Sequence, residues 1–323
     1  MKVLIADKFE AEGVAGLEGL GCEVIQSPDL EGESLADAVA RAKPDALIVR
    51  STKVGAAVIA AGESLRLIIR AGAGTDNIDS NAATERGIAV CNCPGMNADA
   101  VAELTMGLMI ACDRRIVEQT NQLAGGRWNK KEFSKSRGLK GRHLLVVGTG
   151  AIGLGVVRRA KAFGMHVSVQ SRSLTRKWAT ELGVGLVGSS REDLLKALPD
   201  MDVVSMHVPL GDDTMDLCNA DFFGAMKPGS IFLNTSRGGV VDESALLEAV
   251  EKRGIRAGVD VYNDQPSGKD EPWQCPLAGV PGVVTTHHCG ASTDQAQLAV
   301  AEEVVRIIRM YQAHGTFENR VNG

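Results

Sequence analysis

The chain has 323 residues, of which 44 % are hydrophobic and only 4 % aromatic, and its formal net charge is -5. That charge, without a stripe of interleaved basic and aromatic residues, argues against nucleic acid as a partner. No run reaches the roughly 18 uninterrupted apolar residues that a membrane span needs, so no membrane partner is expected. Residues 1–6 are too short for a signal sequence and lead directly to Asp7, which favours the cytoplasm.

The seven cysteines are scattered along the chain. The close pair, Cys91 and Cys93, lacks the two-residue gap of zinc ribbons and redox motifs, and no second pair supports it. We therefore expect ordinary thiols and no metal site.

Short apolar runs alternate with helical patterns from the first residue, as in a parallel sheet with crossover helices. Pro94 and Gly95 end this first series, and Asn97 is placed to cap a long helix from near Ala98 to about Leu123 that links two domains. The strands predicted in the first series are 3–6, 22–25, 46–50, 67–72 and 88–92.

A second series of the same kind follows, so we predict an α/β protein of two doubly wound parallel-sheet domains with a cleft between them. A final helical stretch, 294–312, has no strand of its own, and we expect it to fold back onto the first domain. The strands predicted in the second series are 143–148, 166–170, 203–208, 230–235, 257–261 and 282–286.

GTGAIG at 148–153 stands between a predicted strand and a predicted helix, the context in which a GxGxxG pattern indicates dinucleotide binding. Gly148 permits the tight turn, Gly150 lets backbone amides approach a pyrophosphate, and Gly153 brings the helix close to the sheet. A glycine-rich turn without a ligand is the alternative.

The next strand usually ends in an acidic residue that accepts the hydroxyls of the NAD ribose, but here that place is Ser171. Without a carboxylate, a 2′-phosphate can sit among Ser171, Arg172, Ser173 and Arg176, which favours NADP and leaves NAD open. The alternative is that Arg176 and Lys177 are simply a solvated helix start.

Two polar segments follow strands of the second series, at the edge where open α/β sheets bind ligands. NTSRGGVVDE (234–243) holds Arg237, whose guanidinium suits a carboxylate beside a reacting carbonyl. TTHHCGAST (285–293) holds His288, an imidazole able to exchange a proton with a hydroxyl.

Nearly the whole chain resembles the D-isomer-specific 2-hydroxyacid dehydrogenases, and most of all their phosphoglycerate dehydrogenase branch, which serves serine biosynthesis. The motifs that carry the likeness are VRSTKV (49–54), RAGAGTDNID (70–79), GIAVCNCPGMNADAVAEL (87–104), GRWNKKEF (126–133), GTGAIG, HVPL (207–210), NTSRGGVVDE and HHCGAST.

The resemblance implies a flavodoxin-like substrate-binding domain, 1–96 plus 289–323, and a Rossmann dinucleotide-binding domain, 97–288, with a homodimer formed through the linking helix. It implies that Arg237 binds the substrate carboxylate and carbonyl, that His288 is the acid/base, and that Asn97 contacts substrate from a loop. It also implies cofactor contacts from Gly148, Gly150, Ala151, Ile152, Gly153, Ser171, Arg172, Ser173, His207, Pro209, Thr235, Asp260 and Gly290.

Arg50, Ser51 and Arg70 match positions that hold the phosphate end of the substrate in the phosphoglycerate branch. Arg50 and Arg70 each end an apolar strand, where an arginine without a ligand would be unusual. A salt bridge on the domain surface is the alternative.

The chain departs from the family at two places. Where the family has a glutamate that pairs with the histidine, this chain has Gln265, and His287 stands where proline is usual. Either Gln265 orients His288 by accepting its hydrogen bond and activity moves to lower pH, or the loop shifts so that Asp264 supplies the charge, or the site is catalytically impaired and the protein senses nucleotides.

The sequence thus predicts an enzyme that uses NADP or NAD to move a hydride between nicotinamide and a small D-2-hydroxy or 2-oxo acid. From the likeness to the phosphoglycerate branch, we expect that acid to carry phosphate. An NADPH-dependent glyoxylate or hydroxypyruvate reductase is the alternative within the class.

Overall fold

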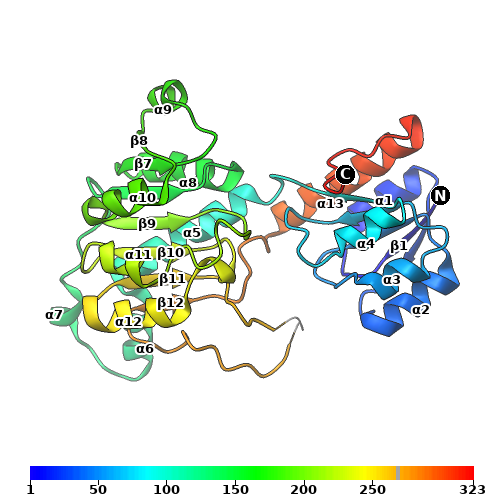
Figure 1. Ribbon diagram of the computed structural model, residues 1–323. Coiled ribbons are helices and arrows are strands. Elements are labelled where there is room, and N and C mark those ends of the chain that lie inside the picture. Colours follow the sequence, from blue (N-terminus) through cyan, green and yellow to red (C-terminus); the bar gives the residue numbers. More distant parts are fainter. Residues whose placement is uncertain (267–269) are drawn as a thin grey trace. The chain divides into compact units, whose positions relative to one another are not determined.

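The computed structural model describes residues 1–266 and 270–323, and these residues divide into two compact units. The first unit joins Met1–Asn97 to Ala291–Gly323, and the second is Ala98–Gly290. Each unit is built on its own parallel sheet (Figure 1).

Within the described residues, the sheet of the first unit has the order β2-β1-β3-β4-β5, the flavodoxin-like arrangement. Its strands are β1 (Lys2–Ile5), β2 (Glu23–Gln26), β3 (Ala46–Val49), β4 (Leu67–Arg70) and β5 (Ala89–Asn92). Its helices are α1 (Ala11–Gly19), α2 (Gly32–Ala42), α3 (Ala56–Ala61), α4 (Ser80–Glu85) and α13 (Asp294–His314).

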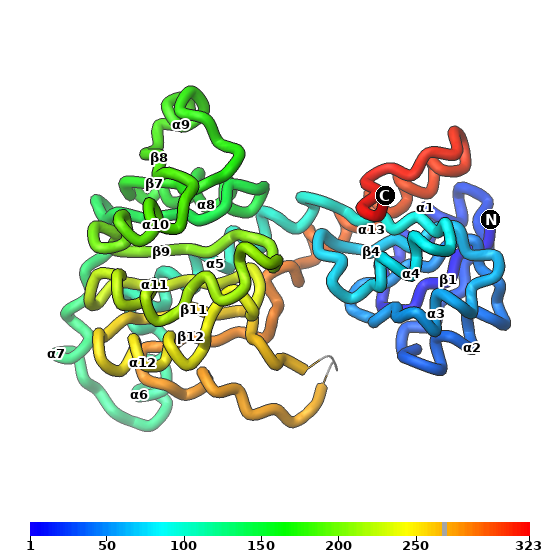
Figure 2. Tube along the Cα trace, in the orientation of Figure 1, coloured from blue at the N-terminus to red at the C-terminus, as the bar shows by residue number. Residues whose placement is uncertain are grey.

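Successive strand residues of this sheet point to opposite faces, and helices cover both faces. Val3 and Ile5 belong to one buried cluster, which includes Leu17 of α1 and Ile308 of α13. Leu4 belongs to the cluster on the other face with residues of α2 and α3. Figure 2 shows the red α13 beside the blue α1, so the two ends of the chain build one domain.

The second unit has the parallel strand order β12-β11-β10-β9-β6-β7-β8 in the described chain, which is a Rossmann-type order. The order in which the strands are added changes side between β6 and β9. Its strands are β6 (His143–Val147), β7 (His166–Gln170), β8 (Gly185–Val187), β9 (Val203–Met206), β10 (Ile231–Asn234), β11 (Arg256–Val259) and β12 (Val283–Thr285). Its helices are α5 (Ala98–Arg114), α6 (Ile116–Ala124), α7 (Lys130–Phe133), α8 (Ala151–Ala162), α9 (Arg176–Leu182), α10 (Arg191–Ala197), α11 (Ala220–Ala225) and α12 (Glu243–Arg253).

Two apolar clusters sandwich this sheet as well. Leu144 and Val146 pack with residues of α5 and α8, whereas Leu145 and Val147 pack with α11 and α12. Phe222, Phe223 and Phe232 meet edge to face in the second cluster, with ring centroids 5.1 to 6.1 Å apart. The parallel strands therefore carry apolar residues on both faces, which leaves their carboxyl ends as the polar edge of the sheet.

The predicted fold class, two parallel-sheet α/β domains, is confirmed, and each predicted strand is found. The sequence missed β8, a three-residue edge strand. The predicted cap of α5 is wrong: the helix begins at Ala98, but the buried Asn97 Oδ1 accepts no hydrogen bond from the described residues. The long helix also ends early, since Arg115 takes a left-handed φ of 54° that separates α5 from α6.

In the described ranges, no helix combines the length and the apolar character that a membrane crossing requires.

Candidate active site

The turn from β6 to α8 has the shape that a pyrophosphate needs. Gly148 has a φ of 95°, and a Cβ there would lie 2.3 Å from the His207 carbonyl oxygen. A Cβ on Gly153 would lie 2.0 Å from the Gly148 oxygen, so helix and turn approach too closely for any side chain. A Cβ on Gly150, by contrast, would have no described atom within 4 Å, which leaves open space at the helix N-terminus. Ala151 and Ile152 follow as the first residues of α8.

The end of β7 offers hydroxyl groups where an acidic residue would select NAD. Ser171 Oγ accepts a hydrogen bond from Thr149 Oγ1 at 2.6 Å and lies 3.3 Å from the backbone nitrogens of Ser173 and Leu174. The exposed Arg172 forms an ion pair with Asp213 at 3.0 Å. This corner thus combines hydroxyls, N–H groups and a guanidinium, all of which suit phosphate oxygens.

His207 ends the β9 segment as a neutral side chain. Its Nε2 lies 2.8 Å from Ser205 Oγ, and burial lowers its pKa to about 3. Its Nδ1 is buried and has no hydrogen-bond partner in the described chain. The Pro209 carbonyl accepts from Thr214 Oγ1 at 2.6 Å, which fixes the following turn. The His207 ring is therefore a neutral polar group at this edge of the sheet.

The Arg237 loop after β10 is held from within by Asn234, a fully buried side chain. Asn234 Nδ2 donates to the Arg237 carbonyl at 2.9 Å, and its Oδ1 accepts from the backbone and hydroxyl of Ser236. The buried Thr235 hydroxyl lies 2.9 Å from Thr105 Oγ1 on α5. This network fixes the backbone that carries the Arg237 guanidinium.

The His288 loop after β12 is held by Asp260, which is 2 % exposed at the end of β11. Asp260 Oδ1 accepts from Thr286 Oγ1 at 2.6 Å and from the Cys289 amide at 3.0 Å, and Oδ2 accepts from the Gly290 amide at 2.9 Å. His288 itself takes a left-handed φ of 49°, which is uncommon outside glycine and asparagine. The carboxylate therefore sets the conformation that presents this imidazole at the edge of the sheet.

Gln265 is the side chain that meets His288. Its Nε2 lies 2.6 Å from His288 Nδ1, and its Oε1 lies 3.3 Å from the backbone nitrogen of Tyr262. The expected pairing of residues 265 and 288 is present, with Gln265 rather than Asp264 against the ring. The expected direction is wrong, since the amide presents its nitrogen to the imidazole and keeps its oxygen for Tyr262.

The loops that carry Arg237 and Gln265 are in contact. A Cβ on Gly238 would lie 2.1 Å from both the carbonyl carbon and the oxygen of Tyr262, so the two backbones pass directly over one another. The Tyr262 hydroxyl donates to the Thr286 carbonyl at 2.7 Å, which joins the His288 loop to the same assembly. The second unit thus brings Arg237, Gln265 and His288 onto three loops that support each other.

A second polar edge lies in the first unit, where β1, β3 and β4 are neighbours. Asp7 Oδ2 accepts from the amides of Arg50, Ser51 and Thr52 at 2.6 to 3.1 Å, and its Oδ1 accepts from the Ser51 hydroxyl at 3.1 Å. Arg50 Nη1 donates to Gln297 Oε1 of α13 at 2.8 Å. Strands β3 and β4 therefore place Arg50 and Arg70 at adjacent strand ends.

Arg70 lies across Gly72, where a Cβ would lie 1.5 Å from Arg70 Nη1. Gly72 has a φ of 150° and leaves room for the guanidinium. Asn97, the remaining predicted contact of this unit, is the residue before α5. Arg50, Ser51, Arg70 and Asn97 thus belong to the first unit, and the other predicted site residues belong to the second.

Three residues that organise these edges were missed from the sequence, namely Asp7, Asn234 and Tyr262. Asp7 and Asn234 have a signal in the sequence, because each is a polar residue at the carboxyl end of an apolar strand. Tyr262 has none, since its contribution to Gln265 is a backbone N–H.

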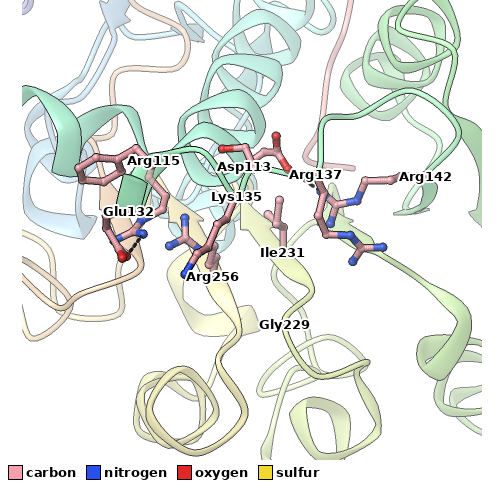
Figure 3. A pocket seen from close by; sticks show the side chains of 11 residues that line it. Asp113, Arg115, Glu132, Lys135, Arg137, Arg142, Gly229, Ile231 and Arg256 are labelled. Carbon is pink, nitrogen blue, oxygen red and sulfur yellow. Dashed lines mark hydrogen bonds and ion pairs between the residues drawn. The ribbon is translucent and has the colours of Figure 1, made fainter. Parts of the chain in front are cut away.

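A separate hollow lies at the opposite edge of the second sheet, at the starts of β10 and β11 and the end of α5 (Figure 3). Its arginines have protein partners: Arg142 pairs with Asp113 at 2.8 Å, Arg115 with Glu132, and Arg256 with the Cys112 carbonyl at 2.6 Å. These contacts hold the end of α5 and the chain after it, and none of the predicted site residues lines the hollow in the described chain.

Cys91, Cys93 and Cys112 are buried among apolar residues, where the thiolate form is disfavoured. Burial raises the pKa of Cys91, Cys93 and Cys112 to about 12.

The fold and the two edges define a dinucleotide-binding α/β protein with a guanidinium and an imidazole at the edge that carries the phosphate-binding turn. Residues 106–290 match the family model described as D-isomer specific 2-hydroxyacid dehydrogenase, NAD binding domain. The chain belongs to this family.

Relatives agree with this assignment. The chain is 40% identical over 315 residues to the D-3-phosphoglycerate dehydrogenase of Methanocaldococcus jannaschii, covering 96% of this chain but 58% of that one. It is 43% identical over 266 residues to the hydroxypyruvate reductase of Thermotoga maritima, covering 82% of this chain and 83% of the relative. A crystal structure of NADPH-dependent glyoxylate/hydroxypyruvate reductase from Sinorhizobium meliloti, in complex with NADP and malonate, superimposes with a TM-score of 0.82 at 26% identity, covering 99% of this chain and 96% of that one.

Proposed function

We propose that the chain is an NAD(P)-dependent oxidoreductase that interconverts a D-2-hydroxy acid and its 2-oxo acid at the carboxyl edge of the second sheet. The observation that carries the proposal is the assembly of the Arg237, Gln265 and His288 loops, in which Gln265 contacts His288 at 2.6 Å. The nicotinamide cofactor, when bound, supplies or accepts the hydride at C2 of the substrate. The open turn at Gly150 and the N-terminus of α8 would hold its pyrophosphate.

Arg237 binds the substrate carboxylate and polarises the oxygen on C2. A guanidinium presents N–H groups in a rigid fork, so one side chain reaches both groups of a 2-oxo acid. The buried Asn234 fixes the Arg237 backbone, which keeps this fork in place before substrate arrives. His288 exchanges a proton with the oxygen on C2.

For the substrate class, we favour an acid that bears phosphate. Support comes from Arg50 and Arg70 at adjacent strand ends and from Asp7, which orients the Arg50–Ser51 backbone. Such a substrate would place the protein in serine biosynthesis. A glyoxylate or hydroxypyruvate reductase is the second candidate, favoured by the likeness to the hydroxypyruvate reductase of Thermotoga maritima.

For the cofactor, we favour NADP over NAD. The end of β7 carries the hydroxyls of Ser171 and Ser173 and the Arg172 guanidinium, and Thr149 donates to Ser171. Ser171 stands where an acidic residue would repel a 2′-phosphate.

For the assembly, we propose a homodimer through the segment that follows α5. The described helix α6 has no buried residue, and Leu123 and Trp128 are 56% and 78% exposed. Apolar groups gathered on one segment favour a protein partner. In sedimentation experiments Trp128→Glu should yield monomers, while Trp178→Glu, at another exposed tryptophan, should leave the dimer intact. If the two variants had the same oligomeric state, the proposed interface would be wrong.

The experiment that tests the proposed activity mixes purified protein with NADPH or NADH and hydroxypyruvate, phosphohydroxypyruvate or glyoxylate, and follows oxidation of the nicotinamide. Turnover with one acid identifies its class. Cofactor binding without turnover of any acid would contradict the proposal and favour the remaining alternative, a catalytically impaired protein that senses nucleotides.

A further inference from the structure

We propose that Gln265 holds His288, in the resting protein, as the neutral imidazole that carries its proton on Nε2. The Gln265 carboxamide donates to His288 Nδ1, and it must rotate before His288 can become an imidazolium. The arrangement bears on the acid/base step of the proposed function, but the proton position itself is a property of the resting chain.

The orientation of the carboxamide follows from its two neighbours. A backbone N–H only donates, so the atom of Gln265 that lies 3.3 Å from the Tyr262 nitrogen must be the oxygen. The other end of the amide is then its NH₂ group, which has only hydrogens to offer. His288 Nδ1, 2.6 Å away from that group, must accept.

The Tyr262 N–H, which fixes the orientation of the Gln265 carboxamide, is held in place by its surroundings. Tyr262 is 5 % exposed, its hydroxyl donates to the Thr286 carbonyl at 2.7 Å, and its ring meets Trp273 edge to face at 5.0 Å. The backbone of Gly238 lies directly against the Tyr262 carbonyl. Tyr262 therefore acts as a positioning residue through its main chain, and the Gln265 oxygen follows it.

Because Nδ1 accepts a hydrogen bond, the protonation state of the imidazole follows. A neutral imidazole has one N–H, and because Nδ1 accepts, that hydrogen is on Nε2. An imidazolium has hydrogens on both nitrogens, which would set an N–H against the NH₂ of Gln265 at 2.6 Å. A glutamate at 265 would instead accept from Nδ1–H and stabilise the charged ring.

Asp260, the buried carboxylate of the same assembly, is engaged with the His288 loop. Both oxygens of Asp260 are occupied by Thr286, Cys289 and Gly290. His287 and Cys289 flank the ring in sequence, and Asp264 precedes Gln265.

Proton transfer to the substrate therefore requires two changes in order. The amide rotates, giving up the Tyr262 N–H, and His288 takes a second proton from solvent water on Nδ1. The new Nδ1–H then donates a hydrogen bond to the rotated Gln265 oxygen. The proton on Nε2 then passes to the oxygen on C2, and His288 is left neutral with its proton on Nδ1. Oxidation uses the reverse sequence.

The test is the tautomer of His288 in the protein without substrate, read from two-bond ¹H–¹⁵N correlation spectra of protein labelled with ¹⁵N-histidine. The signals of His288 among the six histidines are those that disappear in His288→Gln and persist in His287→Gln. We expect an unprotonated Nδ1 and a protonated Nε2 in the wild type, and a protonated Nδ1 in Gln265→Glu. A wild-type Nδ1 that carries the proton, or the same tautomer in both proteins, would overturn the proposal.

A pH titration of the same signals gives the second readout. The His288 pKa should be higher in Gln265→Glu than in the wild type, because the carboxylate stabilises the imidazolium. Gln265→Met removes both hydrogen bonds without adding charge, so it should abolish the tautomer preference without raising the pKa as Glu does. An unchanged pKa in Gln265→Glu would also overturn the proposal. Absence of turnover would refute the proposed function and leave these spectra unaffected.

Discussion

The polar edges of the two sheets are built in the same way but present different side chains. In each, a buried aspartate at a strand end accepts backbone N–H groups of a neighbouring loop: Asp7 accepts from residues 50 to 52, and Asp260 accepts from Cys289 and Gly290. The first loop carries arginine, which stays charged at any ordinary pH, whereas the second carries His288, whose charge depends on its neighbours. One edge is therefore suited to holding an anion, and the other to moving a proton.

The largest expected effect is on the second edge. Arg237→Ala should lower kcat/KM for any 2-oxo acid on the order of 100-fold, or about 2.7 kcal/mol of transition-state stabilisation, because the carboxylate and the polarised oxygen lose their partner. Steady-state kinetics with hydroxypyruvate measures it, with Arg253→Ala at the end of α12 as the matched control. A loss confined to phosphorylated acids would contradict the assigned role.

Substitution of each of the two aspartates tests the two edges separately. Asp260→Asn should mainly lower kcat, by roughly tenfold or more, because one of its loop N–H groups loses an acceptor and the His288 backbone loosens. Asp7→Asn should instead raise KM for a phosphorylated acid and leave kcat nearly unchanged. Kinetics of both variants on the same two acids makes the comparison. If the two variants have the same effect, the edges do not have separate roles.

Substitution of one arginine of the first edge tests whether that edge binds the phosphate of the substrate. Arg50→Ala should raise KM for phosphohydroxypyruvate about tenfold, since a hydrogen bond to a charged group contributes roughly 1.5–3 kcal/mol. KM for unphosphorylated hydroxypyruvate should stay within about threefold of the wild type. Arg41→Ala on the exposed face of α2 is the control. Equal changes for both acids would exclude a phosphate site and favour the reductase candidate.

An effect of similar size is expected at the end of β7, where the cofactor ribose would bind. Ser171→Asp should weaken NADPH relative to NADH on the order of tenfold, because the new carboxylate repels a 2′-phosphate and accepts ribose hydroxyls. Ser171→Ala separates the loss of the hydroxyl from the gain of charge. Fluorescence titration with both reduced nucleotides reads the ratio. An unchanged ratio in Ser171→Asp would contradict the preference for NADP.

The sequence was sufficient for most of the architecture. Apolar strand runs, the glycine pattern at 148–153 and polar residues at strand ends predicted two parallel sheets and the edges at which ligands would bind. Strand β8 was missed because three residues give no measurable periodicity. The end of α5 was missed because a left-handed Arg115 has no sequence signal comparable to glycine or proline.

The contacts inside the candidate site were less predictable. The pairing of residues 265 and 288 follows from the family resemblance, but the direction of their hydrogen bond depends on the Tyr262 backbone N–H, which no residue type encodes. Asp260 was predicted as a cofactor contact, while its carboxylate is bonded to the His288 loop. Main-chain geometry of this kind appears only once the loops are placed.

The acid/base role of His288 is tested most directly by comparing His288→Ala with His287→Ala in the reduction of a 2-oxo acid that the wild type accepts. NADPH binding is measured alongside. We expect His288→Ala to bind the cofactor like the wild type but to lose at least roughly 100-fold in kcat, because the acid/base group is gone. The neighbouring His287→Ala should retain turnover. A wild type without turnover, or a His288→Ala variant as active as His287→Ala, would contradict the assignment of the second edge as the catalytic one.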